Sequence, residues 1–151
     1  MPTIEERLAR LEGKTLPAQQ MRDEIYEDYL KLRMQVDDAE SALRSARTNE
    51  IDIHKKLKMV REAYSREEAA LLATDERAGG KNADERKANA TNLVHEEKAE
   101  GGKLHGYWLA VLNAERDYEA ATAEKEACID HFSAVRYVMR MASGLANSLG
   151  W

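Results

Sequence analysis

The sequence contains few of the residues that cross-link, interrupt or fill compact folds. Its 151 residues include one cysteine, two prolines and one phenylalanine. One cysteine excludes an internal disulfide and a cysteine-rich zinc site. No run of about 18 apolar residues is present, so we expect no membrane span. The charged N-terminus has no apolar segment typical of a secretory signal peptide, which favours a cytoplasmic location.

The residues that are abundant point to long helices. Charged residues make up 34% of the chain, and Ala, Glu, Lys, Arg and Leu dominate its composition. This mixture, with helical periodicity, is typical of coiled coils, whose core is a seam. The net charge is −5 and the pI is near 5.5, which argues against a protein that coats nucleic acid over its whole surface.

Glycine and proline divide the sequence into four segments within one domain, 1–151. Gly tolerates the conformation that ends a helix, and Pro suits a first helical turn. We predict a short helix over 3–12, a long helix over 17–78, a connecting helix over 83–99 and a long helix over 103–149. The first is too short to be stable alone and should dock on the body or on a second copy. The third is poor in large apolar residues and is either an amphipathic arm or a solvated spacer.

Both long segments carry heptad repeats, in which apolar residues recur at alternating steps of three and four. Met21 and Ile25 extend the first stripe upstream, and Glu50 and Glu67 interrupt it. The first stripe comprises Tyr29, Leu32, Val36, Ala39, Leu43, Ala46, Glu50, Ile53, Leu57, Val60, Tyr64, Glu67 and Leu71. The second comprises Tyr107, Val111, Ala114, Tyr118, Ala121, Lys125, Cys128, Phe132, Val135, Met139, Ala142, Ala146 and Leu149. Trp108, Leu112, Ile129 and Tyr137 widen the second stripe, and we expect its C-terminal end, around Phe132 and Val135, to be the best buried part.

Two long heptad helices joined by a shorter segment predict an all-α fold, a long antiparallel coiled-coil hairpin. Because the core of an isolated two-helix hairpin is thin, we expect a helical-bundle homo-oligomer, with a dimer favoured. The residues expected at its interface are Trp108, Leu112, Phe132, Val135 and Met139.

Charge is distributed unevenly along the first long segment. Residues 44–66 hold seven basic and three acidic side chains, a net of +4, whereas residues 1–40 hold six and ten, a net of −4. The basic stretch is either a solvated helix face, a surface for self-pairing with the acidic end, or a phosphate-binding face. The candidate nucleic-acid-binding residues are Arg44, Arg47, Lys55, Lys56, Lys58, Arg61 and Arg66, joined by Arg136 and Arg140 near the aromatic ring of Tyr137.

No motif indicates catalysis. Cys128 occupies a seam position, where a free cysteine is by default a small buried residue, and His131 alone does not make a nucleophilic site. The four histidines, His54, His95, His105 and His131, include no pair with metal-ligand spacing. Heptad seams use most of the apolar residues and leave no pocket, so we expect no enzyme, metal, cofactor or small-molecule substrate.

Two short motifs carry a resemblance. The segment 80–88, GKNADERKA, and the segment 132–137, FSAVRY, lie in the second half of the chain. They resemble elements of small, uncharacterised helical proteins of phage and prophage genomes that are encoded near recombination genes. The resemblance implies a role in DNA transactions by association, and a location in the host cytoplasm.

Three functions follow as expectations. The first is a phage-type accessory protein in DNA recombination or replication, which binds DNA or a recombination protein. The second is a protein-binding inhibitor or adaptor that acts on a host nuclease or defence enzyme. The third is a structural coiled-coil protein.

Overall fold

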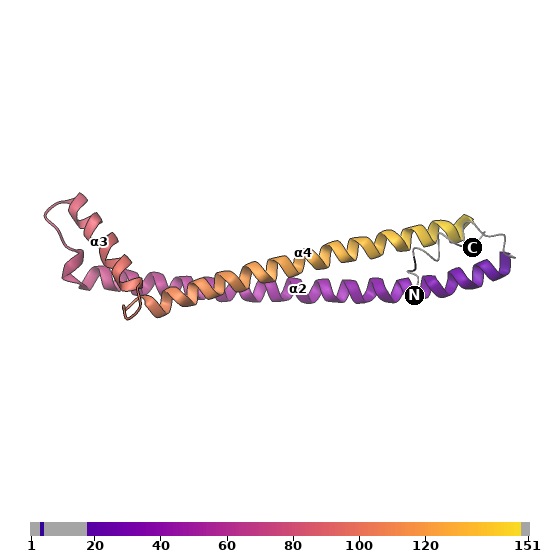
Figure 1. Cartoon of the computed structure of the whole chain (residues 1–151), viewed down its shortest axis with the longest axis horizontal. Helices are drawn as coiled ribbons and strands as arrows, with labels where there is room; N and C mark the ends of the chain where they lie inside the picture. Colours follow the sequence, from indigo (N-terminus) through magenta and orange to yellow (C-terminus); the bar gives the residue numbers. More distant parts are fainter. Residues whose placement is uncertain (1–3, 5–17, 149–151) are drawn as a thin grey trace. The chain divides into compact units, whose positions relative to one another are not determined.

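The computed structural model describes residue 4 and residues 18–148, apart from the side chains of 18–22, 146 and 148. Its elements are α2 (Ala18–Thr74), the 3₁₀ turn η1 (Glu76–Ala78), α3 (Ala83–Lys98) and α4 (His105–Ser148), as Figure 1 shows. No strand occurs in this part of the chain, so the predicted all-α class is confirmed there. Except for Ile4, the predicted helix over 3–12 lies outside the described residues.

The chain divides into two compact units, and each is described here by itself. The terminal unit comprises residues 1–48 and 123–151, and the turn unit comprises residues 49–122. In each unit a stretch of α2 runs antiparallel to a stretch of α4, as the chain order in Figure 1 shows. The turn unit also contains η1 and α3.

The heptad register predicted for α2 matches its burial. Seven apolar side chains of α2 are buried, and all lie on the predicted stripe: Ile25, Leu32, Ala39, Leu43, Ala46, Leu57 and Leu71. Of the two glutamates that interrupt the stripe, Glu50 is half-buried and Glu67 is exposed. Ala39 and Ala46 bring little apolar area to the seam, which keeps the core of the terminal unit thin.

The stripe predicted for α4 matches its burial except at its first residue, Tyr107, which is 39% exposed. Tyr137, which was expected to widen the stripe, is 63% exposed. The stripe residues that are buried as expected are Val111, Ala114, Ala121, Val135 and Ala142. At the first end Leu104 is buried instead of Tyr107, because it lies in the turn before α4 and packs against Leu93 of α3.

Toward the C-terminal end of α4 the buried face moves toward Val138. Leu32, Val138 and Ala142 form a cluster on which Ile4 and Leu145 pack. Ile4 therefore helps to cover an edge that two paired helices alone would leave open. The contact places one residue of the predicted N-terminal helix on the body of the same chain.

The expectation that the stripe around Phe132 and Val135 is the best buried is wrong. Phe132 is half-buried and Val135 is 8% exposed, whereas residues of both units are exposed by 2% or less: Ile25, Leu32, Ala142, Leu57, Leu93 and Leu104. In the turn unit α3 contributes to this burial, because its Leu93 joins Leu71 and Leu104 in a cluster. The connecting segment is therefore not a solvated spacer along its whole length, since Leu93 packs into the core.

Capping interactions explain where the helices begin and end. α2 stops at Thr74, four residues before the predicted end, because the Asp75 side chain accepts a hydrogen bond from the Arg77 N–H and caps η1. α3 begins after Asn82, whose side chain accepts from the Glu85 N–H, as an N-cap does. Gly101 has a φ of 84°, a conformation that glycine adopts without steric cost.

Candidate nucleic-acid interface

The predicted basic residues of α2 fall into both units. Arg44 and Arg47 belong to the terminal unit, whereas the five from Lys55 to Arg66 belong to the turn unit. All seven side chains are exposed. The structure therefore brings together only the turn-unit subset, which we call the basic face: Lys55, Lys56, Lys58, Arg61 and Arg66.

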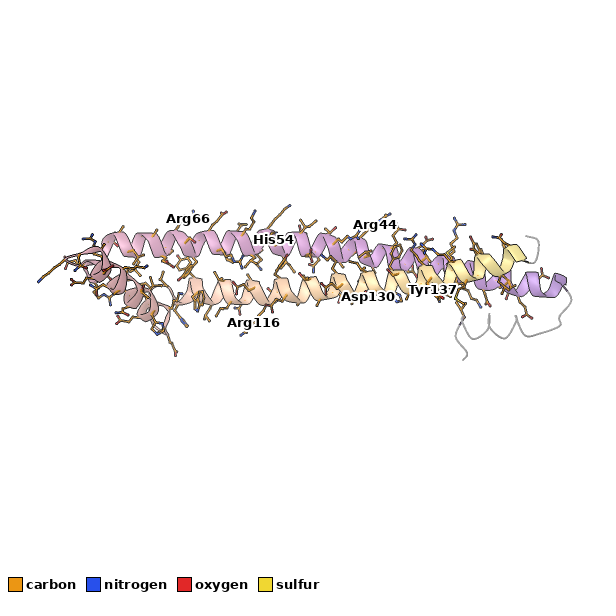
Figure 2. The ribbon with its side chains drawn as sticks, turned by 90° about the horizontal axis from the view of Figure 1, so that it is seen from above. Arg44, His54, Arg66, Arg116, Asp130 and Tyr137 are labelled. Carbon is orange, nitrogen blue, oxygen red and sulfur yellow. The ribbon has the colours of Figure 1, made fainter. Side chains whose placement is uncertain are left out.

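Four of these five cations are not used to hold the turn unit together. Arg61 donates to the Glu115 carboxylate of α4 at 3.2 Å. Within residues 49–122, no ion pair involves Lys55, Lys56, Lys58 or Arg66. Figure 2 shows the Arg66 side chain extending from the side of α2 that faces away from α4. These four charges are thus available to an external anion.

The candidate arginines of the terminal unit are exposed, and two of them have partners within it. Arg44 donates to the Glu40 carboxylate at 2.6 Å, one turn earlier on α2. The guanidinium carbon of Arg136 lies 5.4 Å from the centre of the Phe132 ring, a cation–π contact. Arg140 is exposed on the same helix.

The residues predicted for an oligomer interface contribute largely to packing within the chain. Val135 is buried, and Trp108, Leu112, Phe132 and Met139 are half-buried. Large apolar side chains that are exposed lie elsewhere in each unit. Those of the terminal unit are Tyr26, Leu30, Met34, Tyr137 and Met141, and those of the turn unit are Ile51, Met59, Tyr107 and Leu109.

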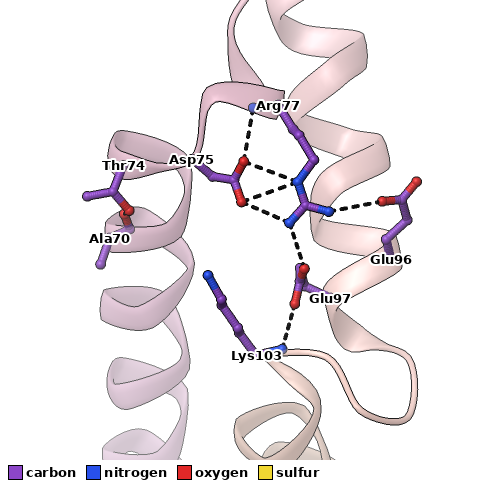
Figure 3. Close-up of polar contacts among 7 residues, drawn as sticks. All are labelled: Ala70, Thr74, Asp75, Arg77, Glu96, Glu97 and Lys103. Carbon is purple, nitrogen blue, oxygen red and sulfur yellow. Dashed lines mark hydrogen bonds and ion pairs between the residues drawn. The ribbon is translucent and has the colours of Figure 1, made fainter.

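A polar network at the end of the turn unit was not predicted from the sequence. The Arg77 guanidinium donates to the Asp75 carboxylate at 2.8 Å and to the Glu97 carboxylate at 2.8 Å, as Figure 3 shows. Glu97 also accepts the Lys103 backbone N–H at 2.6 Å. We call Asp75, Arg77, Glu97 and the Lys103 N–H the junction network. It joins η1, the last turn of α3 and the turn that precedes α4.

The junction network shifts the acidity of its members. Hydrogen bonds from the Arg77 side chain and then from its backbone N–H lower the pKa of Asp75 to about 2. The Lys103 N–H and then Arg77 lower the pKa of Glu97. Both carboxylates therefore stay ionised far below neutral pH, and hydrogen bonds to Asp75 and then Glu97 raise the pKa of Arg77. The sequence feature that could have predicted this network is the Asp-x-Arg triplet, Asp75 to Arg77, just after a long helix.

An aromatic cluster lies beside this network. The Tyr64 and Trp108 rings are 5.7 Å apart between centres. The Lys98 ammonium lies 4.1 Å from the centre of the Trp108 ring and 5.5 Å from that of Tyr64. Burial, with the nearby Glu68 carboxylate, raises the pKa of the Tyr64 phenol. The cluster ties the end of α3 to both long helices and shows no chemistry beyond packing.

The described residues contain no arrangement typical of catalysis or metal binding. Within residues 18–148, no three His, Cys, Asp or Glu side chains lie together as a metal ion would require. The Cys128 sulfur lies 3.9 Å from a Glu124 carboxylate oxygen, and His131 is exposed. No helix in the described part of the chain is both long and apolar enough to span a bilayer.

Comparison with known proteins adds no family to this picture. The chain matches no protein-family model, no curated protein and no solved structure. The observed fold therefore defines the class as a helical protein with two paired long helices and a capped third helix. Its function is inferred from the distribution of charged side chains.

Proposed function

We propose that the protein is a non-enzymatic, phage-type helical accessory protein of DNA recombination or replication, acting in the host cytoplasm. It binds DNA through the basic face of α2. The observation that carries this proposal is the group of four exposed cations without an ion pair in the turn unit. Lysine and arginine side chains in this state bind phosphates by releasing the counterions that surround nucleic acid.

An acidic chain can bind DNA when its positive charge is local. Residues 55–66 hold five basic side chains and one acidic side chain, Glu62, in about three helical turns. At physiological ionic strength charges are screened beyond about 8 Å, so the net charge of the whole chain matters less than this local group. The resemblance of segments 80–88 and 132–137 to phage proteins agrees with such a role.

The test is binding of fluorescently labelled DNA, measured by anisotropy over a series of salt concentrations. We expect affinity to fall steeply with salt, and the variant Lys55→Gln/Lys58→Gln to bind about tenfold more weakly with a shallower salt slope. The matched control is Lys81→Gln/Lys87→Gln, which removes the same charge from exposed positions outside the basic face. No binding by the parent protein at low salt, or equal losses in both variants, would contradict the proposal.

A second candidate function, a protein-binding adaptor or inhibitor, is favoured by an apolar line on α2 of the terminal unit. Leu30 and Met34 are one turn apart and are 43% and 67% exposed. Exposed Asp37 and Asp38 follow them. This pairing of apolar and acidic groups suits a basic, amphipathic partner such as a DNA-binding enzyme. Retention of one defined nuclease or recombination protein, lost in Leu30→Ser/Met34→Ser, would support it.

We also propose a homodimer. The exposed apolar residues of the terminal unit occur on both helices, at Met34 on α2 and at Tyr137 and Met141 on α4. A second copy would cover them and thicken a thin two-helix core. Light scattering should give twice the chain mass of 17.1 kDa, and Tyr137→Ser/Met141→Ser should shift it toward one chain mass. A parent protein of one chain mass would exclude the dimer.

A further inference from the structure

The aromatic rings near the basic face are engaged within the turn unit. Between residues 49 and 66 the rings belong to His54 and Tyr64. His54 stacks on Tyr118 of α4 with ring centres 5.1 Å apart, and Tyr64 packs on Trp108 at 5.7 Å. Proteins that hold single strands without sequence preference stack bases on free aromatic rings. This stretch of α2 therefore offers charge to a nucleic acid but no stacking platform.

The cations of the basic face lie on both flanks of α2. Lys56 and Lys58 are two residues apart, which places them about 160° apart around the helix axis at 3.6 residues per turn. At 3.6 residues per turn, Lys55 and Arg66 lie nearly opposite the buried Leu57 around the helix axis. Figure 2 shows Arg66 on the side of α2 that points away from α4. Positive charge thus surrounds the outer half of the helix instead of forming one line along it.

This distribution fits a groove with a phosphate backbone along each wall. The major groove of duplex DNA is about 12 Å wide and admits an α-helix, whose diameter with side chains is about 10–12 Å. A helix seated there meets phosphates on both flanks, where Lys56 and Lys58 lie. A single strand has one phosphate backbone and uses one flank only.

We infer that the ligand of the basic face is double-stranded DNA, with the outer half of α2 in the major groove and Lys56 and Lys58 on opposite phosphate backbones. This inference rests on the proposed function. The groove-facing side also carries Asp52, Glu62, Ile51 and Met59, all exposed. Two carboxylates beside the floor of the groove oppose close approach, so the phosphate contacts supply the affinity and sequence preference is weak.

The test compares a duplex with each of its single strands by anisotropy. We expect the duplex to bind at least about tenfold more tightly than either strand. Lys56→Gln and Lys58→Gln should each weaken duplex binding by about three- to tenfold. Each should also lower the salt slope by about 0.9, the value for one phosphate contact on duplex DNA. Lys87→Gln on α3 is the control and should change neither quantity.

Groove occupancy is tested with two modified complexes. A duplex whose major groove is filled by glucosylated hydroxymethylcytosine should bind about tenfold more weakly than the plain duplex. Prior saturation of the minor groove with netropsin should leave affinity unchanged. A loss of affinity with netropsin, without a loss on the glucosylated duplex, would overturn the placement.

The outcomes separate the two levels of the proposal. Equal affinity for duplex and single strand, with both still sensitive to Lys56→Gln and Lys58→Gln, would overturn the duplex inference and keep the DNA-binding function. A contribution from only one of the two lysines would overturn the two-walled geometry. No binding to any form of DNA would overturn the proposed function itself.

Discussion

The two units have different kinds of core. In the terminal unit, Leu32 meets Val138 and Ala142, and the neighbouring seam positions Ala39 and Ala46 are small. In the turn unit, three leucines from α2, α3 and the turn before α4 meet in one cluster. A leucine buries about three more methylene-sized groups than an alanine, at about 0.8 kcal/mol each. A third helix therefore adds apolar burial that a pair of helices with alanine layers does not supply.

The two units also differ in their polar interactions. The turn unit ends in the junction network, with the Asp75 and Glu97 side chains 15% and 13% exposed and both bound to Arg77. The terminal unit buries Asp28 completely. α3 therefore contributes to both features of the turn unit, since it supplies Leu93 to the core and Glu97 to the network.

The largest effect should come from Leu93→Ala. Loss of a leucine side chain that is 2% exposed leaves a cavity in the three-leucine cluster, and such changes cost about 2–5 kcal/mol of unfolding free energy. Hydrogen exchange measured by mass spectrometry should show lost protection within residues 75–104, with the terminal unit unchanged. Leu109→Ala, at a residue 42% exposed, is the control. Equal loss of protection in both units would show that they unfold together, and would contradict a separate core in each unit.

Gly102→Ala should be the next largest. A Cβ atom at Gly102 would lie 2.2 Å from the Glu97 backbone oxygen, so the turn between α3 and α4 must shift. Strain of this kind typically costs about 1–3 kcal/mol. Thermal unfolding followed by circular dichroism should show the loss, and Gly106→Ala on α4, where no atom lies within 4 Å of the added Cβ, should show none. An unchanged midpoint for Gly102→Ala would mean that the turn adapts freely.

The smallest effect should be an acid-induced loosening confined to the turn unit. Asp75 and Glu97 have lowered pKa values in the folded chain, so their contribution is full above the unfolded values of about 3.9 and 4.3. It is lost as pH falls from about 4 toward the folded Asp75 value of about 2. Limited pepsin digestion between pH 4 and pH 2 should therefore open residues 75–103 progressively. In Asp75→Asn the same segment should be cut at pH 4 already, with a weaker dependence on pH.

Periodicity was enough to predict the helices and the seam of α2, because burial there follows local spacing along one helix. It was not enough at the two ends of α4. Leu104, just before α4, is buried with Leu93 of α3, and Val138, which is not on the predicted stripe, is buried with Leu32 of α2. The basic residues could be named from the sequence. Their division between two units, and the use of Arg61 by Glu115, depend on which residues of α4 lie opposite.

The position of Lys98 has a practical consequence. Its amine lies against two rings and is half-buried, whereas Lys81 and Lys87 are exposed. An amine-acylating reagent should therefore label Lys98 more slowly than those two, and at a rate set by how often the end of α3 separates from Trp108. Lys81 and Lys87 serve as internal standards in the same sample. The labelling rate of Lys98 relative to theirs therefore reports the opening of the turn unit without any substitution in the chain.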